Sequence, residues 1–320
     1  MAMIDGLNEI YQERGMVFKE NSFADMTEKE FAATHLFPRR SPATFESASS
    51  HQTSQKLRYL PTSFDWKGKG VVTAVKDQGS AGTCWAFSAV QNIEGQWAKL
   101  GKPLTELSVE QVVDCDGTKD AEKEKADCGV FGGWPYLAYQ YVQKAGGIQT
   151  ETDYPYCCGL GGGEGTCFVC PAPGYNKTLC GPPSEYCKIS DSCSAKINPS
   201  KFVAGLKVSG WQWFGQNETD IAINLLNIGP LSVAMNAGML QFYHSGIYDP
   251  LFCDPKSLDH AVLITGYGEE KTILGEMKKY WTVKNSWGKK WGEDGYFRIA
   301  RDKNKCGIAT QVTTVELEII

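Results

Sequence analysis

Several common features are scarce or absent in this 320-residue chain. It has no apolar run of about eighteen residues, which excludes a conventional membrane-spanning helix. No basic block stands out from a net charge of −5, so the positive footprint that a nucleic acid needs is absent. Residues 1–15 are polar and start as if within a helix. We therefore expect no signal peptide here and a natural N-terminus further upstream.

Cysteine, in contrast, is abundant and unevenly distributed. Seven of the twelve cysteines lie between Cys157 and Cys193, a stretch that also holds seven glycines and four prolines. Such density is typical of disulfide-stapled loops in an oxidising compartment. Sequons at Asn176 and Asn217 fit that compartment as glycosylation sites, although such tripeptides also occur by chance. Zinc is the alternative, but the stretch contains one C-x-x-C and no histidine, so we expect disulfides and no metal or cofactor.

The order of the predicted elements indicates an α+β protein. A capping box at Thr27 and Glu30 predicts a helix there, with Phe31, Ala32 and His35 on one face. Residues 39–56 are polar and are expected to form an exposed linker that is open to proteolysis. Further helices are predicted from residue 84, from residue 109 and from residue 135 to 145, and short strands dominate after about residue 206. Helices first and strands later favour an α+β fold in two halves.

One cysteine stands apart, in the segment DQGSAGTCWAFSAVQNIEG. Cys84 directly precedes an apolar stripe at helical spacing, which places it in the first turn of that helix. Unpaired N–H groups and the positive end of the helix dipole favour a thiolate there, and the thiolate is the reactive form. The Gly/Ser turn before it can fold back, so that the Gln78 amide joins the Cys84 N–H in an oxyanion hole.

A thiolate needs a base or counter-ion, and His260 is the favoured candidate. It precedes the apolar stretch AVLITGYG, at a strand end where sheet enzymes place catalytic groups. His35 and His51 lie in the leading part of the chain, and His244 is flanked by aromatic residues. Asn285, in KNSWGKKWG, could orient the histidine as Cys–His catalysis requires. From these residues alone, a structural histidine and a turn asparagine remain alternatives.

Three motifs, taken in order, resemble the papain-like cysteine proteases: DQGSAGTCWAFSA, LDHAVLITGYG and VKNSWGKKWGEDGYFRIAR. The resemblance runs from about residue 60 to the end, interrupted by the cysteine-rich stretch, and some segments are similar to cathepsin F-like members. NSFADMTEKEF, with Asn21, Phe23 and Asp25, resembles an element of the family's inhibitory pro-region. The resemblance implies a two-lobed papain-like fold, with a mainly helical lobe facing a barrel-like antiparallel lobe across the active-site cleft.

The same resemblance implies a division of the chain. Residues 1–59 would be a partial inhibitory pro-segment and linker, and residues 60–320 the catalytic domain. The helical lobe would span about 66–205, with a cysteine-rich insertion at 157–193, and the β lobe about 206–315.

The resemblance also implies roles for single residues. Cys84 would be the nucleophile, His260 its imidazolium partner and general acid, and Asn285 the residue that orients His260. Gln78 would join the Cys84 N–H in the oxyanion hole, and Trp287 would shield the Asn285–His260 hydrogen bond from water. The implied reaction is hydrolysis of peptide bonds through an acyl-thioester.

The implied substrate cleft has a peptide-binding backbone at Gly132 and Gly133 and a P2 pocket. The pocket has its walls and base at Trp134, Pro135, Ala234, Leu258, Ala261 and Gln311. These walls suggest a hydrophobic P2 side chain, whereas the polar Gln311 questions how large or apolar that side chain is. For each of these residues, an ordinary core position is the alternative.

The cysteines depart from the family pattern beside the nucleophile. Members usually carry a cysteine where this chain has Ala81 and its partner where it has Val130, so this bridge is absent at both ends. The resemblance implies two other bridges: Cys253–Cys306 and Cys115–Cys193. Cys167 is a rival partner for Cys115. Without Cys84 eleven cysteines remain, so at least one more thiol is free or pairs between molecules. The following cysteines are left without an assigned partner: Cys128, Cys157, Cys158, Cys167, Cys170, Cys180 and Cys187.

We therefore expect a cysteine endopeptidase in zymogen form. The expected partners are peptide or protein substrates, the chain's own pro-segment as an intramolecular inhibitor, and cystatin-like protein inhibitors. The chain is expected to be monomeric and lysosomal or secreted. The alternative is a catalytically silent or latent homologue that binds partners through its cysteine-rich insertion.

Overall fold

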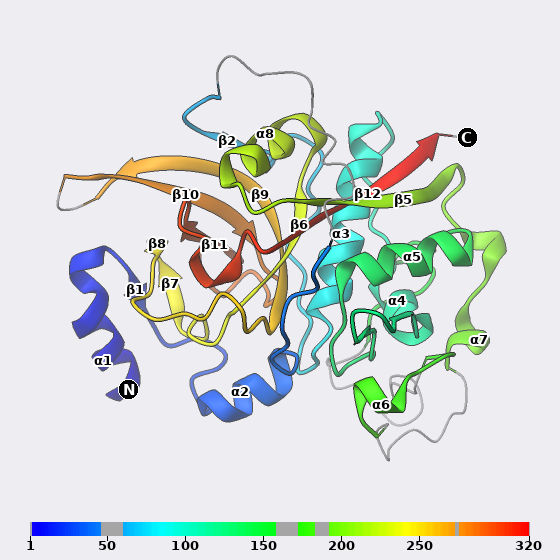
Figure 1. Cartoon of the computed structure of the whole chain (residues 1–320), viewed down its shortest axis with the longest axis horizontal. Coiled ribbons are helices and arrows are strands. Elements are labelled where there is room, and N and C mark those ends of the chain that lie inside the picture. Colours follow the sequence, from blue (N-terminus) through cyan, green and yellow to red (C-terminus); the bar gives the residue numbers. More distant parts are fainter. Residues whose placement is uncertain (1, 46–59, 158–171, 183–191, 273–274, 320) are drawn as a thin grey trace.

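The protein is described here by a computed structural model, which covers residues 2–45, 60–157, 172–182, 192–272 and 275–319. Figure 1 shows two lobes side by side, with helices α3, α4 and α5 in one and a twisted sheet in the other. Helices α1 and α2, from the start of the chain, lie along one edge of the sheet lobe. The predicted two-lobed α+β architecture is thus confirmed.

The leading segment, residues 2–45, contains a short strand and three helical elements. They are α1 (Ala2–Tyr11), the 3-10 helix η1 (Gln12–Arg14), β1 (Val17–Phe18) and α2 (Glu28–His35). The predicted capping box starts α2, because the Thr27 hydroxyl accepts from the Glu30 N–H and the Glu30 carboxylate accepts from the Thr27 N–H. Phe31 and His35 are buried as predicted, but Ala32 is exposed.

The expectation of an exposed linker holds only in part for residues 39–45: Arg39, Ser41 and Thr44 are exposed, but the other residues of this range are partly or fully buried. Arg40 and Leu258 exchange two backbone hydrogen bonds of 2.8 and 3.0 Å. Ala43 is 5% exposed, and the ring of Phe45 packs edge-on against Tyr136. These two apolar side chains, within a polar run, hold the chain against the two lobes. Residues 46–56 of the predicted linker lie outside the described part of the chain.

Three helices start where the sequence predicts and form the core of the first lobe. They are α3 (Cys84–Lys99), α4 (Val109–Cys115) and α5 (Pro135–Ala145). Gly146 ends α5 in the left-handed conformation, at φ 82°. At α4 the Ser108 hydroxyl accepts from the Gln111 N–H, but the Gln111 side chain accepts from Gln149 instead of closing the predicted capping box. Residues 84–97 of α3 are all buried, so Cys84 starts a fixed helix.

A largely antiparallel sheet dominates the second lobe. Its strand order is β5-β12-β6-β9-β10-β11-β8, with β2 paired to β9 and a parallel pairing between β11 and β8. The strands are β2 (Phe64–Asp65), β5 (Leu206–Phe214), β6 (Leu231–Met235), β8 (Ile247–Tyr248), β9 (His260–Lys271), β10 (Met277–Lys284), β11 (Tyr296–Ala300) and β12 (Gln311–Ile319). Helix α8 (Glu218–Ile228) lies among these strands and was not predicted.

Seven short elements complete the described part of the chain. They are β3 (Lys119–Asp120), β4 (Lys125–Ala126), α6 (Lys177–Cys180), α7 (Ser192–Lys196), η2 (Pro199–Lys201), β7 (Tyr243–Ser245) and η3 (Lys305–Gly307). Strand β7 pairs with β1 of the leading segment, which joins that segment to the second lobe.

Disulfides tie these connections together. Cys115–Cys193 and Cys253–Cys306 are the pairs that the resemblance implies. A further bridge, Cys128–Cys180, links the loop before the glycine pair to the insertion. Cys84 is the free thiol among the described residues. The pairing of Cys158, Cys167, Cys170 and Cys187, and the prediction of a further free thiol, lie outside them.

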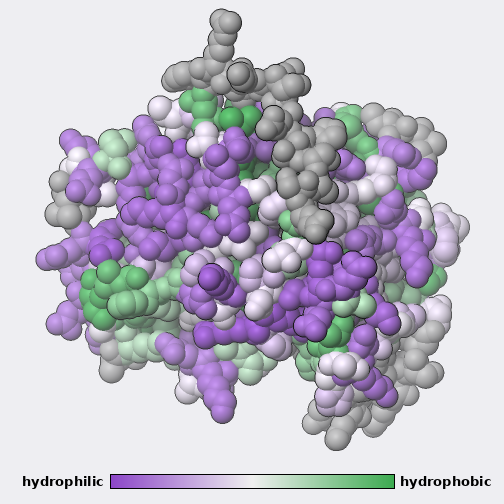
Figure 2. Space-filling view, viewed as in Figure 1, coloured by the Kyte–Doolittle hydropathy of each residue, from purple (hydrophilic) through white to green (hydrophobic). Residues whose placement is uncertain are grey.

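The face seen in Figure 2 is largely hydrophilic. A hydrophobic patch lies on its left, in the region of α1 and β1, where exposed apolar residues include Ile10 and Val17. Among the described helices, none has the length and apolar character that a membrane crossing requires.

Candidate active site

Cys84 is the first residue of α3 and is fully buried. The turn before it is held without the bridge that the resemblance leads one to expect. The Gly82 N–H donates to the Val130 carbonyl at 2.9 Å, and the Gln78 side chain donates to the Ala81 carbonyl at 2.7 Å. A backbone contact between the same two loops therefore replaces the missing disulfide.

His260, Asn285 and Trp287 come together opposite this helix start. The Nε2 atom of His260 lies 2.8 Å from the Asn285 Oδ1 atom, and the His260 ring stacks on Trp287 with centroids 4.6 Å apart. His260 begins β9 and Asn285 directly follows β10, which pairs with β9, so sheet register sets their distance. The ring nitrogen left for proton exchange is Nδ1, which is buried and has no hydrogen-bond partner within the described residues.

The amide of Gln78 is fully engaged. Its Nε2 atom donates to the His35 carbonyl at 2.9 Å as well as to Ala81, and its Oε1 atom accepts from the Ser286 hydroxyl at 2.7 Å. Because His35 belongs to the leading segment, the side chain assigned to an oxyanion hole already binds a carbonyl oxygen in this state.

Burial keeps both reactive groups uncharged. It raises the pKa of Cys84 to about 12, against the opposing effect of the Ala261 N–H beside the sulfur. It also lowers the pKa of His260 to about 4, although the hydrogen bond to Asn285 acts in the other direction. Desolvation in this structure therefore opposes the thiolate that the helix N-terminus favours.

Three neighbouring strands supply one side of the predicted P2 pocket. In the sheet register Gln311 of β12 lies opposite Ala234 of β6, and Ala234 lies opposite Ala261 of β9. All three are buried, as is Leu258 just before β9. Trp134, from the helical lobe, belongs to the same apolar cluster as Ala234, Leu258 and Ala261, and Pro135 follows it as the first residue of α5.

The leading segment runs through this cleft. Gly132 has φ 100°, and a Cβ there would overlap the Cβ of Phe37. Further along, the Gln311 side chain donates to the Ala43 carbonyl at 2.6 Å. The leading segment therefore lies against two of the residues predicted to bind a peptide, Gly132 and Gln311.

A second docking area for the leading segment lies at Gln241, just before β7, and no motif in the sequence pointed to that residue. The Gln241 side chain donates to the Phe23 and Met26 carbonyls, at 3.1 and 3.0 Å. The Asn21 side chain donates to the Gln241 carbonyl at 2.7 Å. Aromatic packing adds to these bonds, because Phe31 lies edge-on to Trp287 with centroids 5.1 Å apart.

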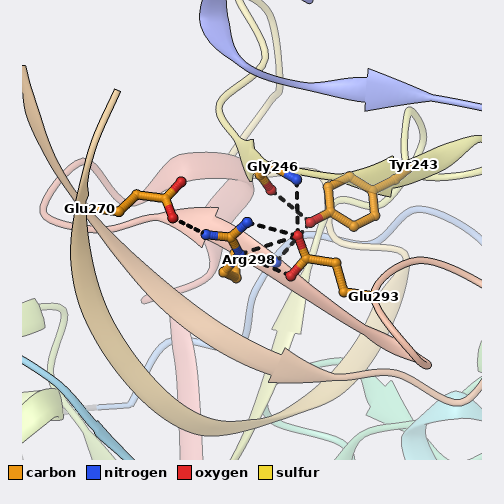
Figure 3. A network of polar contacts seen from close by, with 5 residues as sticks. All are labelled: Tyr243, Gly246, Glu270, Glu293 and Arg298. Carbon is orange, nitrogen blue, oxygen red and sulfur yellow. Dashed lines mark hydrogen bonds and ion pairs between the residues drawn. The ribbon is translucent and has the colours of Figure 1, made fainter. Parts of the chain in front are cut away.

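A charged network braces the end of β7 (Figure 3). Arg298 lies between Glu270 and Glu293 and binds both carboxylates. Glu293 also accepts from the Gly246 N–H at 2.9 Å, and the Tyr243 hydroxyl donates to the Gly246 carbonyl at 2.6 Å. These contacts fix the edge to which β1 of the leading segment pairs.

Comparison with known proteins agrees with this arrangement. The model of the papain family of cysteine proteases matches residues 60–316. The chain is similar to cysteine proteinase 1 of Dictyostelium discoideum, at 37% identity over 93% of this chain and 78% of that one. It is also similar to mouse cathepsin F, at 35% identity over 91% of this chain and 53% of that one. Among solved structures, a digestive procathepsin L2 from Tenebrio molitor larval midgut is 31% identical, with a TM-score of 0.75 over 99% of this chain and 89% of that one.

The chain therefore belongs to the papain family of cysteine proteases. It is a cysteine endopeptidase with the papain-like two-lobed fold, and its structural relatives include precursor forms. The alternative of a catalytically silent binding protein is not favoured by these relatives.

Proposed function

We propose that the chain is a latent precursor whose nucleophile is Cys84, and that residues 1–59 are the pro-segment that inhibits it. The contact between Gln78 Nε2 and the His35 carbonyl carries this proposal. An amide that would stabilise a developing oxyanion is satisfied by the leading segment, so no substrate carbonyl can use it until that segment leaves.

Catalysis then follows from the groups that the open cleft would expose. Cys84 gives its proton to Nδ1 of His260, and the sulfur attacks the carbonyl carbon of the scissile bond. Gln78 Nε2 and the Cys84 N–H stabilise the oxygen that becomes negative. His260 returns the proton to the departing amine, leaving an acyl-thioester. Water, deprotonated by His260, attacks the thioester, which releases the acid product and restores the thiol.

Two neighbours would keep His260 in place during these steps. Asn285 orients the ring through Nε2, and Trp287 covers that bond from one face. Trp287 is 2% exposed here, partly because Phe31 lies on it. After the leading segment leaves, Trp287 shields the His260–Asn285 hydrogen bond for as long as its indole stays packed on the His260 ring.

The substrate preference proposed for the pocket is a hydrophobic P2 side chain. The walls Trp134, Ala234, Leu258 and Ala261 are buried among apolar neighbours. Gln311 at the base donates to the Ala43 carbonyl of the leading segment and loses that partner when the segment leaves, so its polar amide limits how apolar the P2 side chain can be.

We further infer that residues 60–320 form the catalytic domain, with lobes meeting near residue 206. We place the protein in a lysosome or outside the cell, a location that its disulfides fit. We also propose that it is a monomer and that cystatin-like proteins inhibit it. Glycosylation at Asn176 and Asn217 fits the same setting. Each of these side chains caps a helix through Oδ1 and leaves the amide nitrogen outside the capping bonds.

Incubation of the intact chain at acidic pH tests the proposal. We expect shortening near residues 50–60 together with the appearance of peptidase activity, and Cys84→Ala should show neither on its own. Activity in Cys84→Ala, or full activity in the unshortened chain, would contradict the assignment.

A further inference from the structure

The place that holds Arg40 is built from the catalytic lobes themselves. The backbone of Arg40 pairs with Leu258 on the β lobe, whereas its side chain reaches the helical lobe. There Nη1 donates to the Ala126 carbonyl at 3.3 Å, and Nη2 lies 3.6 Å from the sulfur of Cys128. Since Ala126 and Cys128 remain when the leading segment leaves, this place remains as well.

Two buried carboxyl groups, those of Asp116 and Asp127, lie next to the Ala126 and Cys128 contacts of Arg40. Asp116 and Asp127 are both 0% exposed, and their carboxyl groups hydrogen-bond to each other. The Asp116 Oδ1 atom accepts from the Thr118 N–H at 2.8 Å, and the Asp127 Oδ1 atom accepts from the Trp134 N–H at 2.6 Å. Neither Oδ2 atom has a donor among the described residues. One shared proton accounts for both atoms, because two adjacent buried carboxylates cannot both ionise, and it leaves one negative charge beneath Arg40.

The charged groups around Arg40 determine whether a cation is stable at this place. Burial lowers the pKa of Arg40, and the attraction of Asp127 and of the Tyr175 phenol opposes this effect. A guanidinium remains charged in proteins, so the place holds a cation. Lys125 is the competing cation, with its ammonium 5.1 Å from the centre of the Trp134 ring; burial and repulsion by Arg40 lower its pKa. The acidic pair thus keeps a cation at this place despite burial and a neighbouring lysine.

This place adjoins the peptide-binding backbone. The Cys128 N–H donates to the Gly132 carbonyl at 2.8 Å, and Asp127 holds the N–H of Trp134, which walls the P2 pocket. Side chains of an extended peptide point alternately to opposite sides. A substrate with its P2 side chain in the pocket therefore directs its P3 side chain toward Ala126 and Cys128.

We propose that the catalytic domain carries a P3 subsite for an arginine side chain, filled by Arg40 in the precursor and by a substrate arginine afterwards. This inference rests on the proposed function and narrows its substrate class to peptides with a basic residue next to a hydrophobic P2 residue. Arginine is favoured over lysine, because a planar fork of N–H groups can bind the Ala126 carbonyl while facing the disulfide sulfur.

The coupling between Arg40 and Asp127 can be tested in the intact chain. Alkylation of Cys84 by iodoacetamide needs no catalytic activity and reports how often the leading segment opens. Arg40→Gln should speed alkylation about ten-fold. Because Asp127→Asn alone would leave Asp116 to carry the negative charge, both carboxyl groups are replaced together; Asp116→Asn/Asp127→Asn should also speed alkylation about ten-fold, and adding Arg40→Gln to it should bring no further gain. Arg40→Lys should fall between wild type and Arg40→Gln. The matched control is Asp153→Asn, an exposed carboxylate of the same lobe, which should change nothing. If Arg40→Gln combined with Asp116→Asn/Asp127→Asn gives the product of their separate effects, the subsite is overturned.

Two matched peptides test the subsite in the acid-activated enzyme. They share a hydrophobic P2 residue and differ at P3, which is arginine in one and citrulline, its neutral isostere, in the other. The kcat/KM ratio of arginine to citrulline should be about ten in wild type and in Asp153→Asn, and about one in Asp116→Asn/Asp127→Asn. Using the ratio within each enzyme cancels any general loss of activity. Equal cleavage of both peptides by wild type overturns the subsite alone, whereas failure to cleave either contradicts the proposed function.

Discussion

Replacing Gln241 by leucine perturbs the docking of the leading segment without touching the reacting groups. Gln241 is 2% exposed, and its side chain supplies the donors for the Phe23 and Met26 carbonyls. Leucine removes the donors of both hydrogen bonds. Because these bonds exist only when the leading segment is docked, their loss destabilises the docked state and not the open one. Each loss costs about 1 to 2 kcal/mol, so docking weakens by roughly 2 to 4 kcal/mol. At about 1.4 kcal/mol per factor of ten, the open fraction rises about 30- to 1000-fold.

The rate of Cys84 alkylation in the intact chain at neutral pH measures this open fraction. We expect Gln241→Leu to speed alkylation by the factor above. Gln143→Leu is the matched control, because it loses a 2.6 Å bond from its side chain to the Ser209 carbonyl on the other lobe, and it should alkylate like wild type. A rise below about three-fold in Gln241→Leu, or an equal rise in the control, would refute the reasoning.

Three further outcomes are expected. Because burial raises the pKa of Cys84 to about 12, the closed chain should not react, and alkylation of the intact chain should stay far slower than that of the shortened enzyme from mildly acidic to mildly basic pH; equal rates before and after shortening would contradict this. Gly132→Ala should speed alkylation of Cys84 and slow peptide hydrolysis, since its Cβ would overlap Phe37 and strain φ 100°; an unchanged alkylation rate would count against the cleft path. Burial alone would raise the pKa of Asp249, but the hydrogen bonds from Lys278 and Lys305 lower it to about 2 from 3.8. Its stabilising effect is therefore present above the unfolded pKa and fades as pH falls toward 2, so Asp249→Asn should lower the free energy of unfolding by about 1 to 2 kcal/mol at neutral pH. If the difference in the free energy of unfolding between wild type and Asp249→Asn does not shrink as the pH is lowered, this prediction is contradicted.

Local signals in the sequence were enough for the helices that carry the site. The apolar spacing after Cys84 and the stop near Lys99 define α3, and Pro135 and Gly146 bound α5. These signals work because helix starts and stops depend on neighbouring residues alone. Helix α8 carries a similar signal, with Ile221, Ala222 and Leu225 buried, but its place among predicted strands concealed it.

Contacts across the cleft could not be predicted in the same way. Arg40 touches Ala126 and Leu258, which are far from it in sequence and lie on different lobes. Nothing in the residues around position 40 announces such partners. The protonation state of Cys84 depends on the same long-range contacts, because its helix position favours a thiolate and only burial reverses that preference.

The arrangement that fixes Gln78 illustrates both cases. Its place before the nucleophile could be inferred from the Gly/Ser turn, and the structure brings it to that turn through Ala81. Its contact with the His35 carbonyl depends on how the leading segment folds over the cleft. The first is a matter of chain geometry, and the second of tertiary packing.

Labelling with a cysteine-directed epoxide, mapped by mass spectrometry before and after acid treatment of the intact chain, tests most directly whether Cys84 is a nucleophile masked by the leading segment. We predict label on Cys84, with a yield that rises when the chain is shortened near residues 50–60. Label on a different cysteine, or no gain after shortening, would contradict it.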